Sequence, residues 1–258
     1  MDTAYERERY TNSPLVEVIF QLRFPTILAI NSKSPVDFQE RIREQYPFYT
    51  EQTENQDEFL INPQQGAQIH RKSNNKNHNF ISADRKYKVN LTPSFISIST
   101  MEYTQWEDFR SHIEFVIPIF EEIYKPAFYI REGLRYVDLI IREDLGLEGV
   151  PWTKLIRPHL LGMMTSEHEA GTKAYMSQIE YETGIERVLS RANLELVHVN
   201  DKKELAFLID CDYYSIEITQ LVEMLGVAEN LHNASSNFIR SSISEKLRQA
   251  MGPVEIKQ

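Results

Sequence analysis

The stretch PLVEVIFQLRFP, residues 14–25, carries the strongest secondary-structure signal in the chain. Its side chains alternate in character between two prolines. One face of an extended chain would carry Val16, Val18, Phe20, Leu22 and Phe24, and the other Glu17, Ile19, Gln21 and Arg23. An alternation of period two is typical of a strand that buries one face. The stretch therefore predicts a half-buried strand over residues 15–24.

The segment after this strand predicts a short helix and then a β-meander. Ser34 followed by Pro35 is typical of a helix start. Between residues 57 and 101, short apolar runs alternate with polar turns, which favours a series of short strands. The polar run RKSNNKN at 71–77 has the composition of a hairpin tip.

A long helix and a long strand are predicted next. Thr104 and Glu107 have the spacing of a capping box, and an apolar stripe of helical period continues from there to Tyr124. Pro118 interrupts the stripe and predicts a kink or a break, because proline lacks the backbone N–H donor. Residues 128–142 then predict a strand, in which Gly133 indicates a bulge.

The rest of the chain repeats this order of elements. Residues 146–171 are rich in glycine and proline and predict a connection. Strands are predicted over 174–182, 187–197 and 205–214. A helical region follows from about residue 219 to 251, and Gly-Pro directly after it is typical of a helix end.

Together these elements predict an α+β protein of antiparallel sheets covered by long helices. The repeated order suggests two related β-β-β-α halves, 14–145 and 172–258, which are joined by the connector 146–171 and form one compact unit. Residues 1–13 are predicted to be a flexible arm.

Composition indicates which classes of partner and which cellular location are favoured. The formal net charge is −10, from 38 acidic and 28 basic residues. This charge disfavours nucleic acid, whose binding depends on neutralising phosphates, and favours a partner protein, in particular a basic one. The single cysteine, Cys211, cannot form an internal disulfide. With no signal peptide and no apolar run long enough to span a membrane, the chain is predicted to be cytoplasmic.

Four stretches taken in order resemble a known family. They are PLVEVIFQLRFP at 14–25, a strand pair followed by Tyr103, Trp106 and Phe109 at the start of a helix, GLRYVD at 133–138, and HNASSNFIRSSISEKLRQAMGP at 232–253. They are similar to a sporadically distributed family of bacterial proteins of about 250–270 residues, named only by a family number. The resemblance implies an accessory protein of the bacterial cytoplasm, such as a member of a toxin–antitoxin or anti-phage module. It implies no enzymatic activity.

Charged residues on two predicted strands are the first candidate site. Glu17 and Arg23 lie on the strand at 15–24, and Arg135 and Asp138 lie on the strand at 128–142, with Tyr136 next to Arg135. One interpretation is an anion site built from Arg23, Arg135 and Tyr136. The other is a structural ladder of ion pairs, in which Glu17 is the partner of Arg135, since buried charges must be paired.

Two pairs of carboxylates are the second candidate. Glu180 and Glu182, and likewise Asp210 and Asp212, fall on the same face of their strands. They suggest either an acid–base or cation site or a solvated sheet face. No metal site is predicted, because no two of the seven histidines have zinc-ligand spacing. No catalytic residue and no cofactor is predicted either, since GxxxxGK, GxGxxG and GxSxG are absent.

The C-terminal helical region is the third candidate. Ile239, Ile243 and Leu247 form an apolar row that is offset from the main stripe of this region. The row suggests either packing over the chain's own sheet or a surface for a homodimer or a partner protein.

From these observations the sequence favours a non-catalytic interaction protein of the bacterial cytoplasm, such as the neutralising or regulatory member of a toxin–antitoxin or anti-phage system. The alternative is a nucleotide- or phosphate-directed enzyme that uses the strand carboxylates and arginines.

Overall fold

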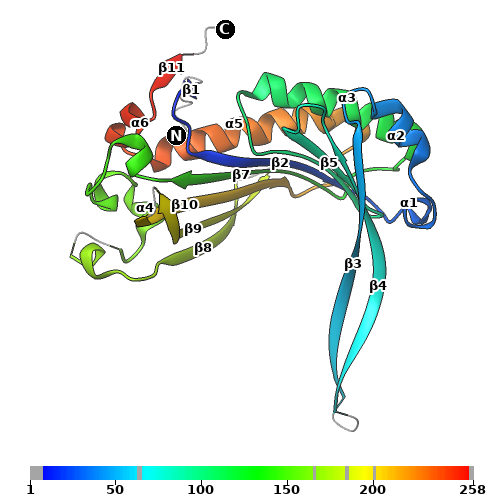
Figure 1. The fold of residues 1–258 in the computed structure, drawn as a ribbon, viewed down its shortest axis with the longest axis horizontal. Helices are drawn as coiled ribbons and strands as arrows, with labels where there is room; N and C mark the ends of the chain where they lie inside the picture. Colours follow the sequence, from blue (N-terminus) through cyan, green and yellow to red (C-terminus); the bar gives the residue numbers. More distant parts are fainter. Residues whose placement is uncertain (1–7, 63–65, 165–166, 184–185, 200–201, 256–258) are drawn as a thin grey trace.

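An antiparallel sheet of nine strands runs through the protein, with helices packed on it, so the predicted α+β class is confirmed (Figure 1). The computed structural model describes residues 8–62, 66–164, 167–183, 186–199 and 202–255. In spatial order the strands are β3 (Phe48–Asn62), β4 (Gly66–Ile81), β5 (Tyr87–Leu91), β6 (Phe95–Thr100), β2 (Leu15–Arg23), β7 (Arg131–Ile140), β10 (Lys202–Ser215), β9 (Glu186–Val199) and β8 (Met176–Glu182).

Two long helices lie on the same side of this sheet (Figure 1). They are α3 (Trp106–Tyr124) and α5 (Met224–Ser242), and α5 packs on β7 and β10. The shorter helices are α1 (Leu28–Ser32), α2 (Val36–Ile42), α4 (Pro158–Leu161) and α6 (Glu245–Ala250). Neither α3 nor α5 covers the other side of the sheet, which we call the open face, and the β3–β4 hairpin extends away on that side (Figure 1).

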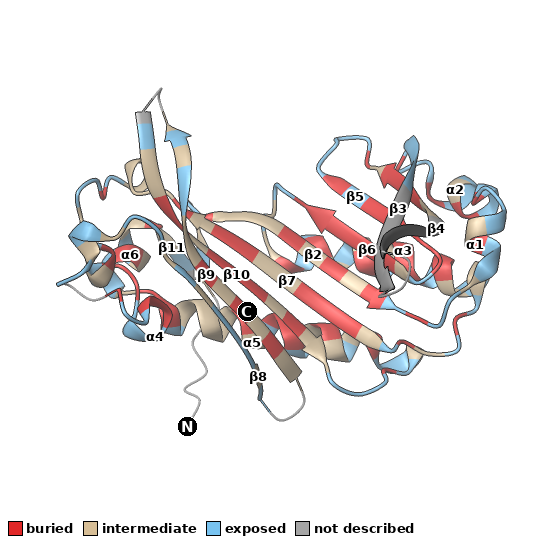
Figure 2. Ribbon diagram, turned by 90° about the horizontal axis from the view of Figure 1, so that it is seen from below, coloured by how far each residue is buried: buried red, intermediate tan, exposed pale blue. Residues whose placement is uncertain are grey.

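Strand β2 lies at the centre of the sheet, with the two faces that its sequence predicts. Val18, Phe20 and Leu22 are each 0% exposed and belong to the main core. Phe24 follows on the same face and packs on Phe120 of α3, with ring centroids 4.9 Å apart. Figure 2 shows the sheet from the open side, where buried and partly exposed positions alternate along the strand. The core therefore lies between the sheet and the helices.

The β3–β4 hairpin is much longer than the sequence predicts. The register runs from Phe48 opposite Ile81 to Asn62 opposite Gly66. Residues 71–77 therefore lie within β4, and the prediction of a hairpin tip there is wrong. A polar composition is typical of loops, but polar side chains can also line a strand, and Asn77 within β4 is only 8% exposed.

Three local predictions also need correction. Helix α3 continues through Pro118. Proline has no backbone N–H to donate to the carbonyl of Glu114, but both residues are exposed, so solvent can replace the missing donor. The capping box does not form: Thr104 Oγ1 donates instead to Asp108, at 2.6 Å. Gly133 pairs regularly with Gln21, and the bulge lies in β2 between Leu15 and Glu17.

Part of the predicted flexible arm is paired with the C-terminal segment. Strand β1 (Glu8–Tyr10) is antiparallel to β11 (Pro253–Glu255). Arg248 of α6 forms an ion pair with Glu8. The N-terminal strand β1 and the C-terminal strand β11 are thus held together next to α6.

Among the described residues, no helix has the length and apolar character needed to cross a membrane.

Candidate functional site

The open face of the sheet carries most of the charged residues that the sequence singled out. Residues that pair directly on neighbouring strands share a face. Such pairs connect the five strands β2, β7, β10, β9 and β8, namely Ile19–Arg135, Arg135–Asp212, Asp212–Leu189 and Leu189–Glu180. Alternation then places further predicted residues on this face: Glu17, Arg23, Glu182 and Asp210. The structure therefore brings the two candidate groups of charges together on one surface.

Arg135 is the centre of this surface, and its partner differs from the one proposed. It donates from Nε and Nη2 to the two carboxylate oxygens of Asp210, at 2.6 and 2.8 Å. This bidentate contact is the main reason why the pKa of Arg135 is raised, while Glu17 adds only a longer-range attraction. The proposed Arg135–Glu17 pair is thus replaced by an Arg135–Asp210 pair.

The other charges extend the same ladder across β7, β10, β9 and β8. Arg191 Nη1 donates to Asp210 at 3.2 Å, and Arg131 Nη2 donates to Asp212 at 2.7 Å. Two further contacts join Arg187 to Glu182 and the Tyr214 hydroxyl to Glu180.

All four predicted carboxylates are thus engaged by a donor. They do not converge on a cation, and the described residues hold no cluster of three or more metal-ligating side chains.

Arg131 and Gly133 show how the backbone accommodates this ladder. A Cβ atom at Gly133 would stand 2.3 Å from Nη1 of Arg131. The glycine therefore leaves room for the guanidinium group, which lies 4.3 Å from the ring centroid of Tyr214. Arg23, on β2 opposite Arg131, is exposed and has no ion pair with the described residues.

The other half of the open face is built from amides and hydroxyls that the sequence analysis missed. Its members are Asn77, Asn79, Asn90, Ser97 and Ser99, all at most 9% exposed. The Asn90 amide donates to Asn77 at 3.1 Å and also to Asn79. The signal was present as the alternations NHN at 77–79 and SIS at 97–99, which place polar side chains on one face of a strand.

We expect Arg135→Ala to destabilise the protein by about 1–3 kcal/mol. Removing one member of a buried ion pair costs about 3–5 kcal/mol, but here Arg135 is 37% exposed and Arg191 still binds Asp210. Urea unfolding provides the measurement. The control is Arg187→Ala, whose partner Glu182 is exposed, so that stability should change little. An equal loss of unfolding free energy in both variants would show that the burial of Asp210 does not make the Arg135–Asp210 pair more stabilising than an exposed pair.

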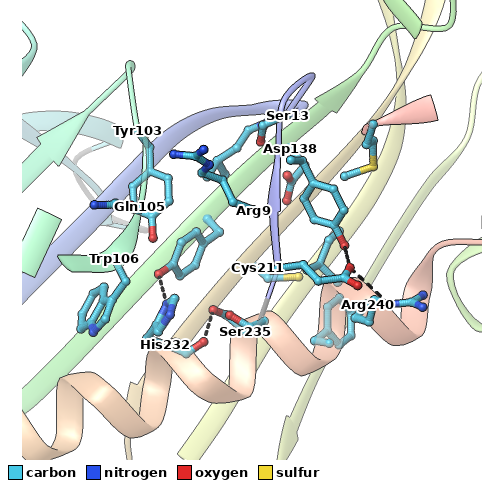
Figure 3. Close-up of a pocket in the computed structure, with 18 of the residues that line it drawn as sticks. Arg9, Ser13, Tyr103, Gln105, Trp106, Asp138, Cys211, His232, Ser235 and Arg240 are labelled. Carbon is cyan, nitrogen blue, oxygen red and sulfur yellow. Dashed lines mark hydrogen bonds and ion pairs between the residues drawn. The ribbon is translucent and has the colours of Figure 1, made fainter. Parts of the chain in front are cut away.

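Tyr136 points to the opposite side of the sheet, away from Arg135. Adjacent residues of a strand face opposite ways, so the two cannot share one anion site. Tyr136 lines a cavity of about 840 Å³ between the sheet, α5, residues 8–15 and the β6–α3 loop. Its hydroxyl contacts Nδ1 of His232 at 2.8 Å, and the ring of His232 stacks on Trp106 at 4.5 Å (Figure 3).

Two of the three residues in the apolar row of the C-terminal region are fully buried, and the third is partly buried. Ile243 and Leu247 are both 0% exposed, and Ile239 packs against the core. Helix α5 ends at Ser242, and Ile243 forms a β-bridge with Ile156 of the connector. The connector therefore covers the row that would have been free on one continuous helix.

No protein-family model matches this chain, and no curated protein is significantly similar to it.

Proposed function

We propose that the protein is a non-catalytic interaction module that binds a partner protein on its open face. The observation that carries this proposal is a sheet face which neither long helix covers (Figure 1) and which carries a ladder of arginine–carboxylate pairs across β7, β10, β9 and β8. A rigid sheet presents these groups at fixed spacing, at little entropic cost on binding.

The chemistry of the face favours a protein over a nucleic acid. Arg131, Arg135, Arg187 and Arg191 are all bound to carboxylates of neighbouring strands. These four arginines are therefore not free to bind phosphates, and the whole chain carries −10. A basic protein would be attracted over long range by the net charge, and at short range it would meet the exposed carboxylates of Glu180 and Glu182.

The setting proposed for this module is the bacterial cytoplasm, as a neutralising or regulatory member of a toxin–antitoxin or anti-phage system. It follows from the resemblance to the sporadically distributed bacterial family.

We also propose that the protein consists of two related halves. In support, β2 and β7 pair with each other, each pairs with the last strand of the meander that follows it, and each meander is followed by a long helix.

The alternative proposal is a nucleotide- or phosphate-directed enzyme on the same face, and it has less support. Such an enzyme needs arginines that are free to bind phosphate, whereas Arg135 and Arg191 converge on Asp210. Only Arg23 offers an uncommitted guanidinium group among the described members of the predicted site.

Site-specific photocross-linking tests the proposed surface. A benzophenone amino acid is placed at Ile19, Gln21 or Gln178 on the open face, or at Ser111 on the solvent side of α3 as the control. After irradiation in bacterial cells and nuclease treatment, we expect one and the same protein attached at the three open-face positions and none at Ser111. Attachment mainly at Ser111, or none at the open face, would contradict the proposal.

A further inference from the structure

The cavity on the helix side of the sheet contains a buried acid without a partner. Asp138 of β7 lines the cavity and is 8% exposed. Among the described residues, no donor lies within hydrogen-bonding distance of its carboxylate. Its direct neighbours on the flanking strands are Leu15 and Ile209, which are apolar. An unpaired acid at such a place is costly to bury, and the cost is removed when a bound group supplies a donor.

Desolvation raises the pKa of Asp138 to about 7, so near neutral pH both forms of the carboxyl are populated. A cation next to it would favour the ionised form and gain a charge-assisted hydrogen bond.

Aromatic side chains form the wall beside this acid (Figure 3). Tyr136 precedes Asp138 by two residues on the same face, and Tyr103 meets the Tyr136 ring edge-on, at 6.1 Å and 85°. Trp106 and His232 continue the wall as a parallel stack, with ring planes 5° apart. Such rings attract a cation through their faces and pack against another flat ring.

The position of this wall is fixed by further contacts. Trp106 Nε1 donates to Glu229 of α5 at 2.6 Å, and Arg110 donates to the same carboxylate at 3.2 Å. The Tyr136 hydroxyl is held by His232, as described above. The wall therefore stands ready for a ligand without rearrangement, which lowers the entropic cost of binding.

The charges around the cavity also favour a cationic ligand. Arg240 lies at the rim, where Glu8 and Glu245 are both within ion-pair distance. Arg9 lines the cavity as an exposed residue and does not share the depth of Asp138. The deepest charged group is thus the carboxylate. The cavity volume of about 840 Å³ lies in the range of small-molecule sites.

We propose that this cavity binds a small organic cation, a protonated amine attached to an aromatic ring, with the ammonium group on Asp138 and the ring against Tyr103, Tyr136 and Trp106. The site is separate from the open face, because Tyr136 and Arg135 point to opposite sides of β7. It extends the proposed function with a ligand, and its test is independent of the partner protein.

Calorimetry with three matched compounds tests the proposal. Phenethylamine, phenylethanol and phenylacetate share one ring and differ in charge. We expect phenethylamine to bind at least about tenfold more tightly than the neutral or the anionic compound, because only the ammonium group can form a charge-assisted hydrogen bond with Asp138. Equal affinity for all three, preference for phenylacetate, or no detectable binding of phenethylamine would overturn the proposal.

Two substitutions separate the roles of charge and ring. Asp138→Asn should weaken phenethylamine binding about tenfold and leave phenylethanol binding unchanged, because only the charge is lost. Tyr103→Leu should weaken both compounds alike. Asp144→Asn, at an exposed aspartate outside the cavity, is the matched control and should change neither affinity. Retention of full phenethylamine affinity by a folded Asp138→Asn protein would exclude the carboxylate as the recognition group.

Discussion

Val18→Asp is expected to abolish folding or to leave the protein insoluble. Val18 is 0% exposed at the centre of β2, between β6 and β7, and its side chain faces the helices. Burying an ionised carboxylate there without a partner costs several kcal/mol. Loss of packing is added to this cost, and a domain of this size is stabilised by only about 5–15 kcal/mol. Circular dichroism and the soluble yield provide the measurement.

The adjacent residue supplies the control for Val18→Asp. Ile19 lies on the open face, opposite Ser99 and Arg135, and is partly exposed. Ile19→Asp should therefore give a folded, soluble protein, with the new carboxylate close to a guanidinium group. If both variants fold, or if both fail, the assignment of the two faces of β2 is wrong.

The strands that alternate strictly in the sequence are those that could be predicted. Val18, Phe20 and Leu22 are buried in the order that their period of two requires. The three strands predicted after the connector correspond to β8, β9 and β10, although the apolar run at 205–209 in β10 does not alternate. In contrast, residues 71–77 of β4 are polar at every position and show no alternation, so the sequence favours a loop there.

The members of the candidate site could be named from the sequence, but their partners could not. Alternation identifies the faces of Arg135 and Asp210, whereas their contact depends on which strands are neighbours. Strand β7 lies between β2 and β10, so the acid on β10 competes with Glu17 for the same guanidinium group. The burial of Ile243 likewise depends on its bridge to Ile156, which is distant in the chain.

Asp138 shows the limit of sequence reasoning most directly. The sequence groups it with Arg135 in one charged constellation, but residues three apart in a strand face opposite sides, so Asp138 lies away from that guanidinium group. Its environment arises from α5, residues 8–15 and the β6–α3 loop, which meet only in the folded protein. The cavity was therefore not predicted.

Glu132→Gln is expected to make the protein more stable at alkaline pH and to remove a large part of its pH dependence. Glu132 of β7 is 0% exposed, and neither carboxylate oxygen has a hydrogen-bond partner of normal geometry among the described residues. Desolvation outweighs a weak contribution from the backbone N–H of Ala228 and raises the pKa of this carboxyl to about 9.

The sign of the effect follows from proton binding. Between the pKa of a glutamate in the unfolded chain, about 4.3, and the folded value, the folded protein holds a proton that the unfolded chain has lost. Rising pH therefore favours unfolding, by about 1.4 kcal/mol per pH unit for this group. From pH 5.5 to pH 8 the wild type should lose roughly 3 kcal/mol through Glu132, a loss that glutamine does not share.

Urea unfolding of the wild type and of Glu132→Gln at both pH values measures this difference. Asp138 acts in the same direction up to its pKa of about 7 in both proteins, so only the difference between the two curves reports on Glu132. Glu148→Gln, at an exposed position, should follow the wild type. Parallel curves for wild type and Glu132→Gln would mean that water or a neighbouring donor reaches the carboxylate. A gap that widens with pH would instead establish Glu132 as a neutral acid in the core beneath α5.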